Sequence, residues 1–451
     1  MGFSKDFVWG SATASYQIEG AAFEGGRGYT VWDDFCTING NVFDGSDGSV
    51  ACDHYHRYKE DVQYMKKLGM KAYRLSLAWS RLMPTGEGEV NEEGVKFYHN
   101  LFDELIANGI TPYVTLFHWD LPFDLYAKGG WQNPEMVEWF AAYAELVAKL
   151  YGDKVKHFIT FNEPQCFLGL GHVTGEHAPG TIMSQRSTLA MTHIMLKAHG
   201  AAVKKIRENV SGAKIGIAPT STVACPNSDS AKDVKAARDT YFDVPEQENY
   251  LWTVSWFSDP IFFGKYPEAG LKLFEKDLPD MTKEDFELIS QPLDFYGQNI
   301  YNGYMVEADE EGKPRMLTRK MGHPRTAIGW PVVPESLYWG PKFLYERYKL
   351  PILITENGLS CTDTVDLNGE IHDADRCDFY HRYLRELRRA AIDGVDVMGY
   401  FAWSLMDNFE WAKGYTERFG LIHIDYETQK RTPKDSAYWM QKVMESNGEN
   451  L

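Results

Sequence analysis

Eight short apolar runs, separated by amphipathic stretches of helical period, constrain the fold more than any other feature of this sequence. Regular alternation of strand-like and helix-like segments is typical of parallel βα units. Several runs are apolar at nearly every position, as expected for strands that helices cover on both faces. The predicted strands are residues 7–13, 71–79, 111–119, 157–162, 214–220, 294–300, 351–356 and 397–404.

The stretches between these runs predict six long helices, several of which begin near Asp, Pro or Glu and end at Gly. These helices are residues 53–69, 92–109, 134–151, 184–209, 335–349 and 373–393. Eight strands with intervening helices favour a closed (β/α)8 barrel, an α/β fold, over an open doubly wound sheet, since no glycine-rich nucleotide-binding motif follows any strand. The longer segments should wall a pocket at the carboxyl ends of the strands, and they are residues 20–52, 221–293 and 301–334.

Length and composition are compatible with one large globular domain. The chain has 451 residues, but barrels with insertions reach this length as one unit. A content of 44% hydrophobic residues, with 13 Trp, 26 Tyr and 25 Phe, can fill a large core. Because no low-complexity linker divides the sequence, we expect a single domain over residues 1–451.

The net charge limits the classes of partner. Lys and Arg number 46 against 64 Asp and Glu, which gives a formal charge of −18. Such a field repels phosphate backbones and anionic lipid, so we expect neither nucleic acid nor a membrane surface as a partner. A neutral or cationic small molecule fits better, although an acidic surface that serves only solubility is the simpler explanation of the charge.

Cysteine usage and the N-terminal sequence indicate a cytoplasmic protein. The N-terminus enters a strand-like run almost at once, which leaves no room for a signal peptide, and no apolar run approaches the ~18 residues of a membrane span. No cysteine pair has metal-like spacing, so we expect reduced thiols, no metal and no cofactor. The six cysteines are Cys36, Cys52, Cys166, Cys225, Cys361 and Cys377.

Two of the predicted strands run directly into a glutamate, Glu163 and Glu356. A carboxyl group at the end of a buried strand is partly desolvated, which raises its pKa, whereas one beside donors or cations stays ionised. For one such acid alone, a helix cap or a solvated loop position is the more common explanation. Strand ends of one parallel barrel converge on one rim, however, and two carboxyl groups flanking a bond are what glycosidic cleavage requires.

Other strand ends carry side chains suited to a sugar. Gln, Asn, His and Glu can hydrogen-bond hydroxyl groups, and Trp offers a flat apolar face to the C–H side of a sugar ring. A lone His or Trp is more often part of the core, but their concentration at the predicted rim indicates a polyol ligand. These strand-end residues are Gln17 and Glu19, His118, Trp119 and Asp120, Asn299 and Tyr301, and Trp403, Asp407, Asn408, Glu410 and Trp411.

Ordered sequence blocks from about residue 3 to residue 440 resemble those of glycoside hydrolase family 1, the β-glucosidase family. Their number and common order make a chance match negligible. The blocks are FVWGSATASYQIEG (7–20), YRLSLAWSR (73–81), TLFHWDLP (115–122), TFNEP (160–164), SDPIFFGKYPE (258–268), ITENG (354–358) and FAWSLMDNFEWAKGYTERFGL (401–421).

The resemblance implies a role for each matched position. Glu163 would be the general acid/base and Glu356 the nucleophile of a retaining double displacement. Arg74 and Tyr301 would keep the nucleophile ionised and oriented. The sugar-binding set implied for the first subsite is Gln17, His118, Trp119, Asn162, Asn299, Tyr301, Trp403, Glu410 and Trp411, with Phe419 lining it and Trp330 at the pocket mouth.

Two positions bear on specificity. Family members that cleave 6-phospho-sugars carry a small hydroxyl residue where this chain has Glu410, whose charge would repel a phosphate. Many members have Trp after the NEP motif, but here Gln165 follows Pro164, which removes an expected aromatic platform beyond the first sugar. The leaving-group preference therefore stays open at this point.

We therefore expect an exo-acting β-glucosidase that acts on aryl glucosides and short cello-oligosaccharides, as in cellulose degradation, and that tolerates β-galactosides and β-fucosides. A 6-phospho-β-glycosidase and a non-catalytic sugar-binding protein on the same scaffold are the alternatives. Glu410 disfavours the first, and the presence of both Glu163 and Glu356 disfavours the second. A homo-oligomer is compatible with these observations.

Overall fold

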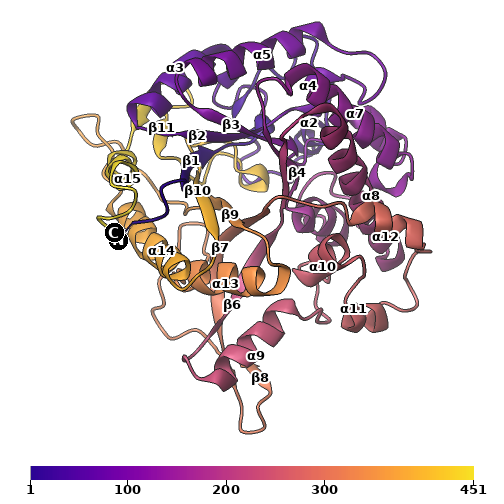
Figure 1. The fold of residues 1–451 in the computed structure, drawn as a ribbon. Helices are drawn as coiled ribbons and strands as arrows, with labels where there is room; N and C mark the ends of the chain where they lie inside the picture. The colour runs from indigo at the N-terminus through magenta and orange to yellow at the C-terminus, as the bar shows by residue number, and fades with distance from the viewer. Residues whose placement is uncertain (1) are drawn as a thin grey trace.

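A closed barrel of parallel strands forms the centre of the molecule (Figure 1), in a computed structural model that describes residues 2–451. Neighbouring strands pair in the order β5, β4, β3, β2, β1, β10, β9, β7, β6. The prediction of a (β/α)8 barrel is confirmed, and every predicted strand is present. The barrel strands are β1 (Val8–Ala12), β2 (Ala72–Ser76), β3 (Thr111–Phe117), β4 (His157–Asn162), β5 (Lys214–Ala218), β6 (Thr220–Pro226), β7 (Tyr296–Ala308), β9 (Ile352–Asn357) and β10 (Val397–Trp403).

The barrel closes where the predicted strand 214–220 divides in two. β5 pairs with β4, and β6 pairs with β7, so the two segments occupy one strand position. Pro219 lies between them, and its carbonyl accepts a hydrogen bond from the Asn299 amide at 3.0 Å. A proline carbonyl can thus extend the ladder at a position whose nitrogen has no hydrogen to donate.

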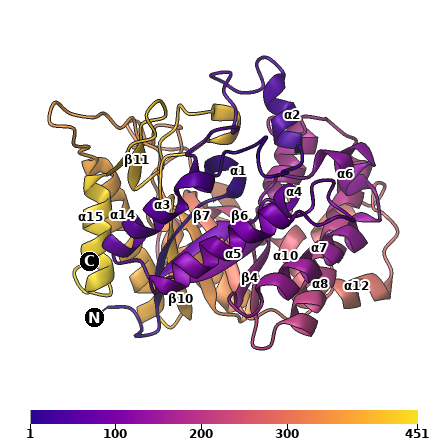
Figure 2. The same cartoon turned by 90° about the horizontal axis from the view of Figure 1, so that it is seen from above.

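Strand register brings the carboxyl ends level at one end of the barrel. Ala12 lies beside both Arg74 and Trp403, and Asn299 lies beside Glu356. In a view turned by 90°, the helix α1 (Ser15–Ile18), which follows β1, lies in the upper half of the molecule, and α2 (Val31–Thr37) lies above it near the top edge (Figure 2). The two chain ends lie together at the opposite side, where Phe3 N donates to Asn447 O at 3.0 Å.

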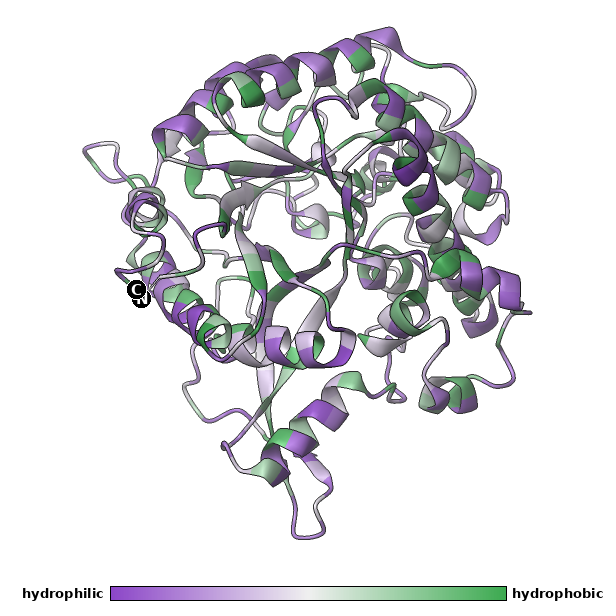
Figure 3. Ribbon diagram, in the orientation of Figure 1, coloured by the Kyte–Doolittle hydropathy of each residue, from purple (hydrophilic) through white to green (hydrophobic). Residues whose placement is uncertain are grey.

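Six long helices surround the barrel, and the predicted ends agree with them to within two residues. Side-chain caps begin two of them, since Asn91 accepts from the amide of Glu93 and Ser184 from that of Ser187. Hydrophilic and hydrophobic residues alternate along these outer helices (Figure 3), as expected for helices that pack on a barrel and face water. They are α3 (His54–Lys67), α5 (Glu92–Ala107), α7 (Met136–Tyr151), α8 (Gln185–Asn209), α13 (Ser336–Tyr348) and α14 (Ala374–Ile392).

The long segments expected to wall a pocket contain short elements that the sequence pattern does not predict. β7 continues well beyond the barrel and turns back into β8 (Pro314–Met316). Residues 221–293 hold β6 and the helices α9 (Ala231–Phe242), α10 (Ser255–Phe263), α11 (Glu268–Leu273) and α12 (Lys283–Ile289). The remaining elements are α4 (Trp79–Leu82), α6 (Phe123–Ala127), η1 (Gly130–Gln132), the π-helix η2 (Gln165–Thr174), η3 (Trp411–Lys413), β11 (Ile422–Ile424), β12 (Arg431–Pro433) and α15 (Asp435–Glu445).

Within residues 2–451, no helix has both the length and the apolar character that a membrane crossing requires.

Candidate active site

A cavity of about 1230 Å³ opens at the carboxyl ends of the barrel strands. Its walls include Phe35 and Asn41 from the first long segment, Trp252 from the second and Arg319 from the third. The prediction that these segments wall a pocket is therefore confirmed. Ten of the predicted site residues line it: His118, Trp119, Glu163, Tyr301, Trp330, Glu356, Trp403, Glu410, Trp411 and Phe419.

Glu163 follows the last residue of β4 at a sharp turn into η2. Its φ of 42° lies in the left-handed region, which non-glycine residues adopt rarely and which is frequently found at functional sites. The backbone holds it there, because its amide donates to Ala218 O at 2.8 Å. Glu163 is 6% exposed, and its carboxyl group accepts from Asn299 Nδ2 at 2.8 Å on Oε1 and from the Cys166 thiol at 3.1 Å on Oε2.

Glu356 lies within β9 and is 3% exposed. Arg74 Nη1 lies 2.5 Å from its Oε1, and the Tyr301 hydroxyl donates to its Oε2 at 2.6 Å. Arg74 comes from β2 and is fully buried, so the ion pair is shielded from water. A buried pair of this kind is stable only when its other polar atoms are also satisfied.

Two asparagines and a threonine connect the carboxyl groups. Asn162 Oδ1 accepts from Arg74 Nη2 at 2.6 Å and from Asn299 Nδ2 at 2.9 Å. The same Asn299 amide group donates to Glu163, and its Oδ1 accepts from Thr355 Oγ1 at 2.6 Å. This network runs from Glu356 through Arg74 to Glu163, so the positions of both carboxyl groups are set before any substrate arrives.

The pKa values of the two carboxyl groups have different causes. Burial and, to a smaller extent, the charge of nearby Glu356 together raise the pKa of Glu163 to about 7. Burial also raises the pKa of Glu356, but the Arg74 guanidinium and the Tyr301 hydroxyl act against it. One group can thus hold a proton near neutral pH while the other is stabilised as an anion.

Polar groups for a hydroxyl-bearing ligand surround this pair. Gln17 Nε2 donates to Asn408 Oδ1 at 2.9 Å and lies 3.4 Å from Glu410 Oε2. Asn162 Nδ2 donates to His118 Nε2 at 3.0 Å, and burial beside Arg74 lowers the His118 pKa, which keeps the imidazole neutral.

Two buried polar atoms of predicted site residues, and one carboxyl group, have no strong partner in the described part of the protein at this end of the barrel. Within residues 2–451, neither Gln17 Oε1 nor His118 Nδ1 has a hydrogen-bond partner in the protein. Burial and the charge of Glu356 raise the pKa of Glu410 to about 8. Buried polar atoms without partners are rare in native proteins, and the one on His118, which lines the cavity, marks where a ligand hydroxyl group can bind.

Aromatic rings form the rest of the cavity wall. Trp119 and Trp411 have ring centroids 4.5 Å apart, and both adopt positive φ angles, 82° and 50°. On another part of the wall, Trp330 lies 5.2 Å from Tyr301 and 6.0 Å from Phe419. The backbone at Trp119 and Trp411 is therefore held in an uncommon conformation that fixes the direction of the rings.

Four predicted residues lie behind the cavity wall. Arg74, Gln17, Asn162 and Asn299 are buried and do not line the cavity, although each contacts a residue that does. All the predicted site residues therefore gather at one end of the barrel, some at the surface of the cavity and some directly beneath it.

The sequence pattern does not predict several residues of the wall. Trp252 and Asn302 come from segments with weak strand or helix patterns, while Cys166 contacts Glu163 directly. The spacing of three residues between Glu163 and Cys166, about one helical turn, could have indicated this contact. Gln165, which stands where many family members have Trp, is buried and does not line the cavity. Its Nε2 donates to the carbonyls of Thr220 at 3.1 Å and Thr253 at 3.0 Å.

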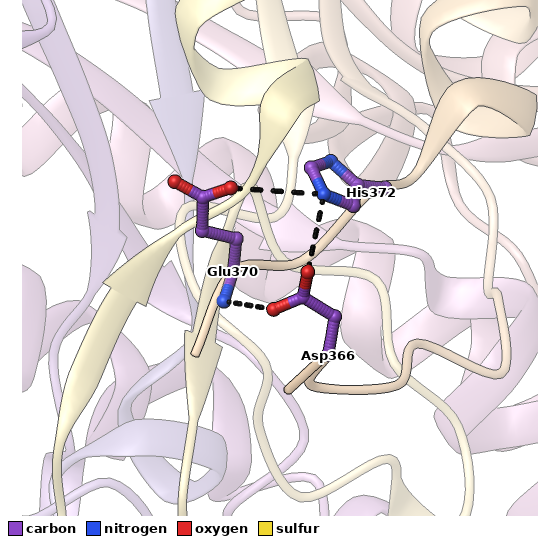
Figure 4. A group of neighbouring side chains, drawn as sticks. All are labelled: Asp366, Glu370 and His372. Atoms are coloured by element: carbon purple, nitrogen blue, oxygen red, sulfur yellow. Dashed lines mark hydrogen bonds and ion pairs between the residues drawn. The ribbon is translucent and has the colours of Figure 1, made fainter. Parts of the chain in front are cut away.

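A separate group of possible metal ligands lies on the loop between β9 and α14 (Figure 4). Asp366, Glu370 and His372 are the group of this kind in the described part of the chain, and none of them lines the cavity. Asp366 Oδ1 accepts from the amides of Asn368 and Glu370 at 2.8 and 2.9 Å, as in a surface turn. Exposed groups of this kind are common without a metal, and we assign this one no part in the site.

Comparison with known proteins relates the chain to one family over its whole length. The family model described as glycosyl hydrolase family 1 matches residues 1–449. The 1,4-beta-D-glucan glucohydrolase of Thermotoga neapolitana is 43% identical over 447 residues, which cover 99% of both chains. Beta-glucosidase A of Acetivibrio thermocellus is 43% identical over 452 residues, again 99% of both chains.

Solved structures are similar to the same extent. The beta-glucosidase from Thermotoga maritima in complex with glucoimidazole has a TM-score of 0.91 and 43% identity, with 99% of each chain covered. The same values hold for the complex of that enzyme with galacto-hydroximolactam.

Proposed function

Because the chain belongs to glycosyl hydrolase family 1 and is a retaining β-glucosidase, we propose that Glu163 is its general acid/base and Glu356 its nucleophile. The observation that carries the assignment is the unequal environment of the two carboxyl groups. Glu356 contacts a guanidinium and a phenol, whereas Glu163 contacts an amide and a thiol. Only the first set includes a charge that stabilises a permanent anion.

The first step forms a covalent glycosyl-enzyme. The Glu356 carboxylate attacks the anomeric carbon while Glu163 gives its proton to the departing oxygen. Arg74 and Tyr301 orient the attacking carboxylate, and the neutral His118 contributes a hydrogen bond to the sugar without adding a charge.

The second step reverses the role of Glu163. Once Glu356 is esterified, its negative charge no longer raises the pKa of Glu163, so that carboxyl group ionises more readily. As a carboxylate it removes a proton from the incoming water, which attacks the glycosyl-enzyme and restores Glu356. The product keeps the β-configuration.

We also propose that the substrates are terminal β-D-glucosyl groups of aryl glucosides and short cello-oligosaccharides, with β-galactosides and β-fucosides tolerated. A relative from Thermotoga neapolitana is named a 1,4-beta-D-glucan glucohydrolase, and the similar Thermotoga maritima enzyme binds galacto-hydroximolactam. Gln17 and Glu410 offer hydrogen bonds to sugar hydroxyl groups, and the Glu410 carboxyl group favours a free sugar over a 6-phosphate. The chain is an enzyme, which sets the binding-only alternative aside.

Six free thiols support a cytoplasmic location.

A substrate panel tests this specificity. We expect hydrolysis of aryl β-glucosides, β-fucosides and β-galactosides, glucose release from cello-oligosaccharides, and much lower activity on an aryl 6-phospho-β-glucoside. Replacing Glu410 by Ser should lower kcat/KM for the glucoside about 10- to 100-fold, the cost of leaving a buried polar partner without its hydrogen bond. The exposed Glu427, which does not line the cavity, provides the matched control through Glu427→Ser. A wild-type preference for the phosphorylated substrate would contradict the proposal.

A further inference from the structure

The thiol of Cys166 lies directly against the carboxyl group of Glu163. Its Sγ is 3.1 Å from Glu163 Oε2, and the Cys166 amide donates to the Glu163 carbonyl at 2.9 Å. The side chain is 4% exposed and lines the cavity. Both the backbone and the side chain of this residue therefore hold the turn that presents Glu163.

The two oxygens of Glu163 are not equivalent in this arrangement. Oε1 accepts an N–H from Asn299, and that donor cannot become an acceptor. Oε2 is therefore the oxygen on which the catalytic proton resides. A thiol can donate through S–H and accept through sulfur, so Cys166 can remain bonded to Oε2 in both protonation states.

The thiol itself keeps its proton in this environment. Burial and the adjacent Glu163 charge raise the pKa of Cys166 well above its ordinary value. An S–H group is thus present throughout the neutral range, and it donates whenever Glu163 is ionised.

We propose that Cys166 is a positioning residue for Glu163, whose thiol donates to the ionised Oε2 and accepts from the protonated Oε2. Through this exchange it holds the carboxyl group in one orientation during both steps of the reaction, and it stabilises the carboxylate needed in the second step. The inference rests on the proposed role of Glu163 as the acid/base.

Replacement of Cys166 isolates this contact from the other electrostatic influences on Glu163. The other titratable or charged groups that act on Glu163 come from different elements and are unchanged by a substitution at position 166. A valine is larger than cysteine and an alanine is smaller, and neither has a donor, whereas a serine keeps one. The titratable or charged groups on other elements that act on Glu163 are Glu356 on β9, Arg74 on β2, Tyr301 on β7 and Glu410 beyond β10.

The test is the pH dependence of kcat/KM for a neutral aryl β-glucoside. Activity is lost at high pH as Glu163 ionises, and the thiol bond favours ionisation, so its removal raises the Glu163 pKa. We expect Cys166→Val and Cys166→Ala to move the alkaline limb upward by about half a pH unit, typical of one weak hydrogen bond, and Cys166→Ser to leave it at or below the wild-type position. Cys225→Val is the matched control, because that buried thiol lies outside the cavity and its one hydrogen bond within residues 2–451 is to the Val223 carbonyl, at 3.7 Å.

Two results would overturn the inference. One is an unchanged alkaline limb in both the valine and alanine variants, and the other is an equal shift in Cys166→Ser. A purely structural role would lower the melting temperature without moving the limb. Glu163→Gln separates this failure from that of the proposed function: if Glu163 is the acid/base, this variant loses the alkaline limb whatever the Cys166 variants do.

Discussion

Glu163 and Glu356 differ less in their burial than in the groups that contact them. Both are below 10% exposed, yet a guanidinium and a phenol bind one, and only neutral donors bind the other. A difference in neighbours is enough to separate the roles of two identical side chains in the same cavity. The negative charge of Glu356 raises the pKa of Glu163, which helps Glu163 to keep its proton for the first step. Esterification of Glu356 removes this effect, which helps Glu163 to ionise for the second step.

The pKa of Glu163 provides a prediction at the residue scale. It is about 7 in the free enzyme, so kcat/KM should fall as pH rises through this value, because the acid loses the proton that it must donate. In Glu356→Gln the like charge is absent, and the pKa of Glu163 should fall. Carboxyl ¹³C chemical shifts recorded against pH in both proteins would measure the two values. A Glu163 pKa that stays the same or rises in Glu356→Gln would show that Glu356 does not control the proton.

The loop after β10 shows how an element is held in place by buried charges. Asp407 Oδ1 accepts from Lys434 Nζ at 2.6 Å and from the Gly420 amide at 2.9 Å, while its Oδ2 accepts from Arg418 at 2.6 Å. Lys434 also binds Asp363 and is fully buried. This cluster ties the loop that carries Glu410 and the cavity aromatics to the start of α15.

Replacing Lys434 by Met should therefore destabilise the protein by about 3–5 kcal/mol, because two buried carboxylates lose their common partner. We also expect a higher KM, since the loop that binds the sugar loses an anchor. Thermal and urea unfolding measure the first effect, and steady-state kinetics the second. Lys442→Met on the same helix is the matched control, since Lys442 is exposed and its loss should change stability by less than about 0.5 kcal/mol. Equal stability of the two variants would contradict this account of the loop.

The barrel is the part of the molecule that its sequence predicts best. Strands such as β2 and β9 are buried at every position, and their short runs of mainly apolar residues stand out from the amphipathic helices around them. Elements such as α11, with six residues, or the outer half of β7 have weak patterns because other segments of the chain supply most of their packing. The division of β5 and β6 at Pro219 depends on closure of the barrel, which no local pattern encodes.

The residues of the site also differ in how far the sequence predicts them. Glu163 and Glu356 could be found because each ends an apolar run, and the resemblance to a family supplied their partners. The contact of Cys166 with Glu163 depends on the left-handed turn at Glu163, and the Lys434 to Asp407 pair joins residues from different elements. The three-residue spacing could have indicated that Cys166 lies near Glu163, but the geometry of this contact and the Lys434 to Asp407 pair follow from tertiary packing.

The central claim, that Glu356 is the nucleophile and Glu163 the acid/base, is tested most directly by azide rescue of two alanine variants. Both should hydrolyse 2,4-dinitrophenyl β-D-glucoside slowly without azide. In Glu356→Ala, azide enters the face left open by the missing carboxylate and should give the α-glucosyl azide. In Glu163→Ala, azide attacks the glycosyl-enzyme in place of water and should give the β-glucosyl azide. The anomeric proton coupling in ¹H NMR identifies each product, and the opposite pairing of variants and products would contradict the assignment.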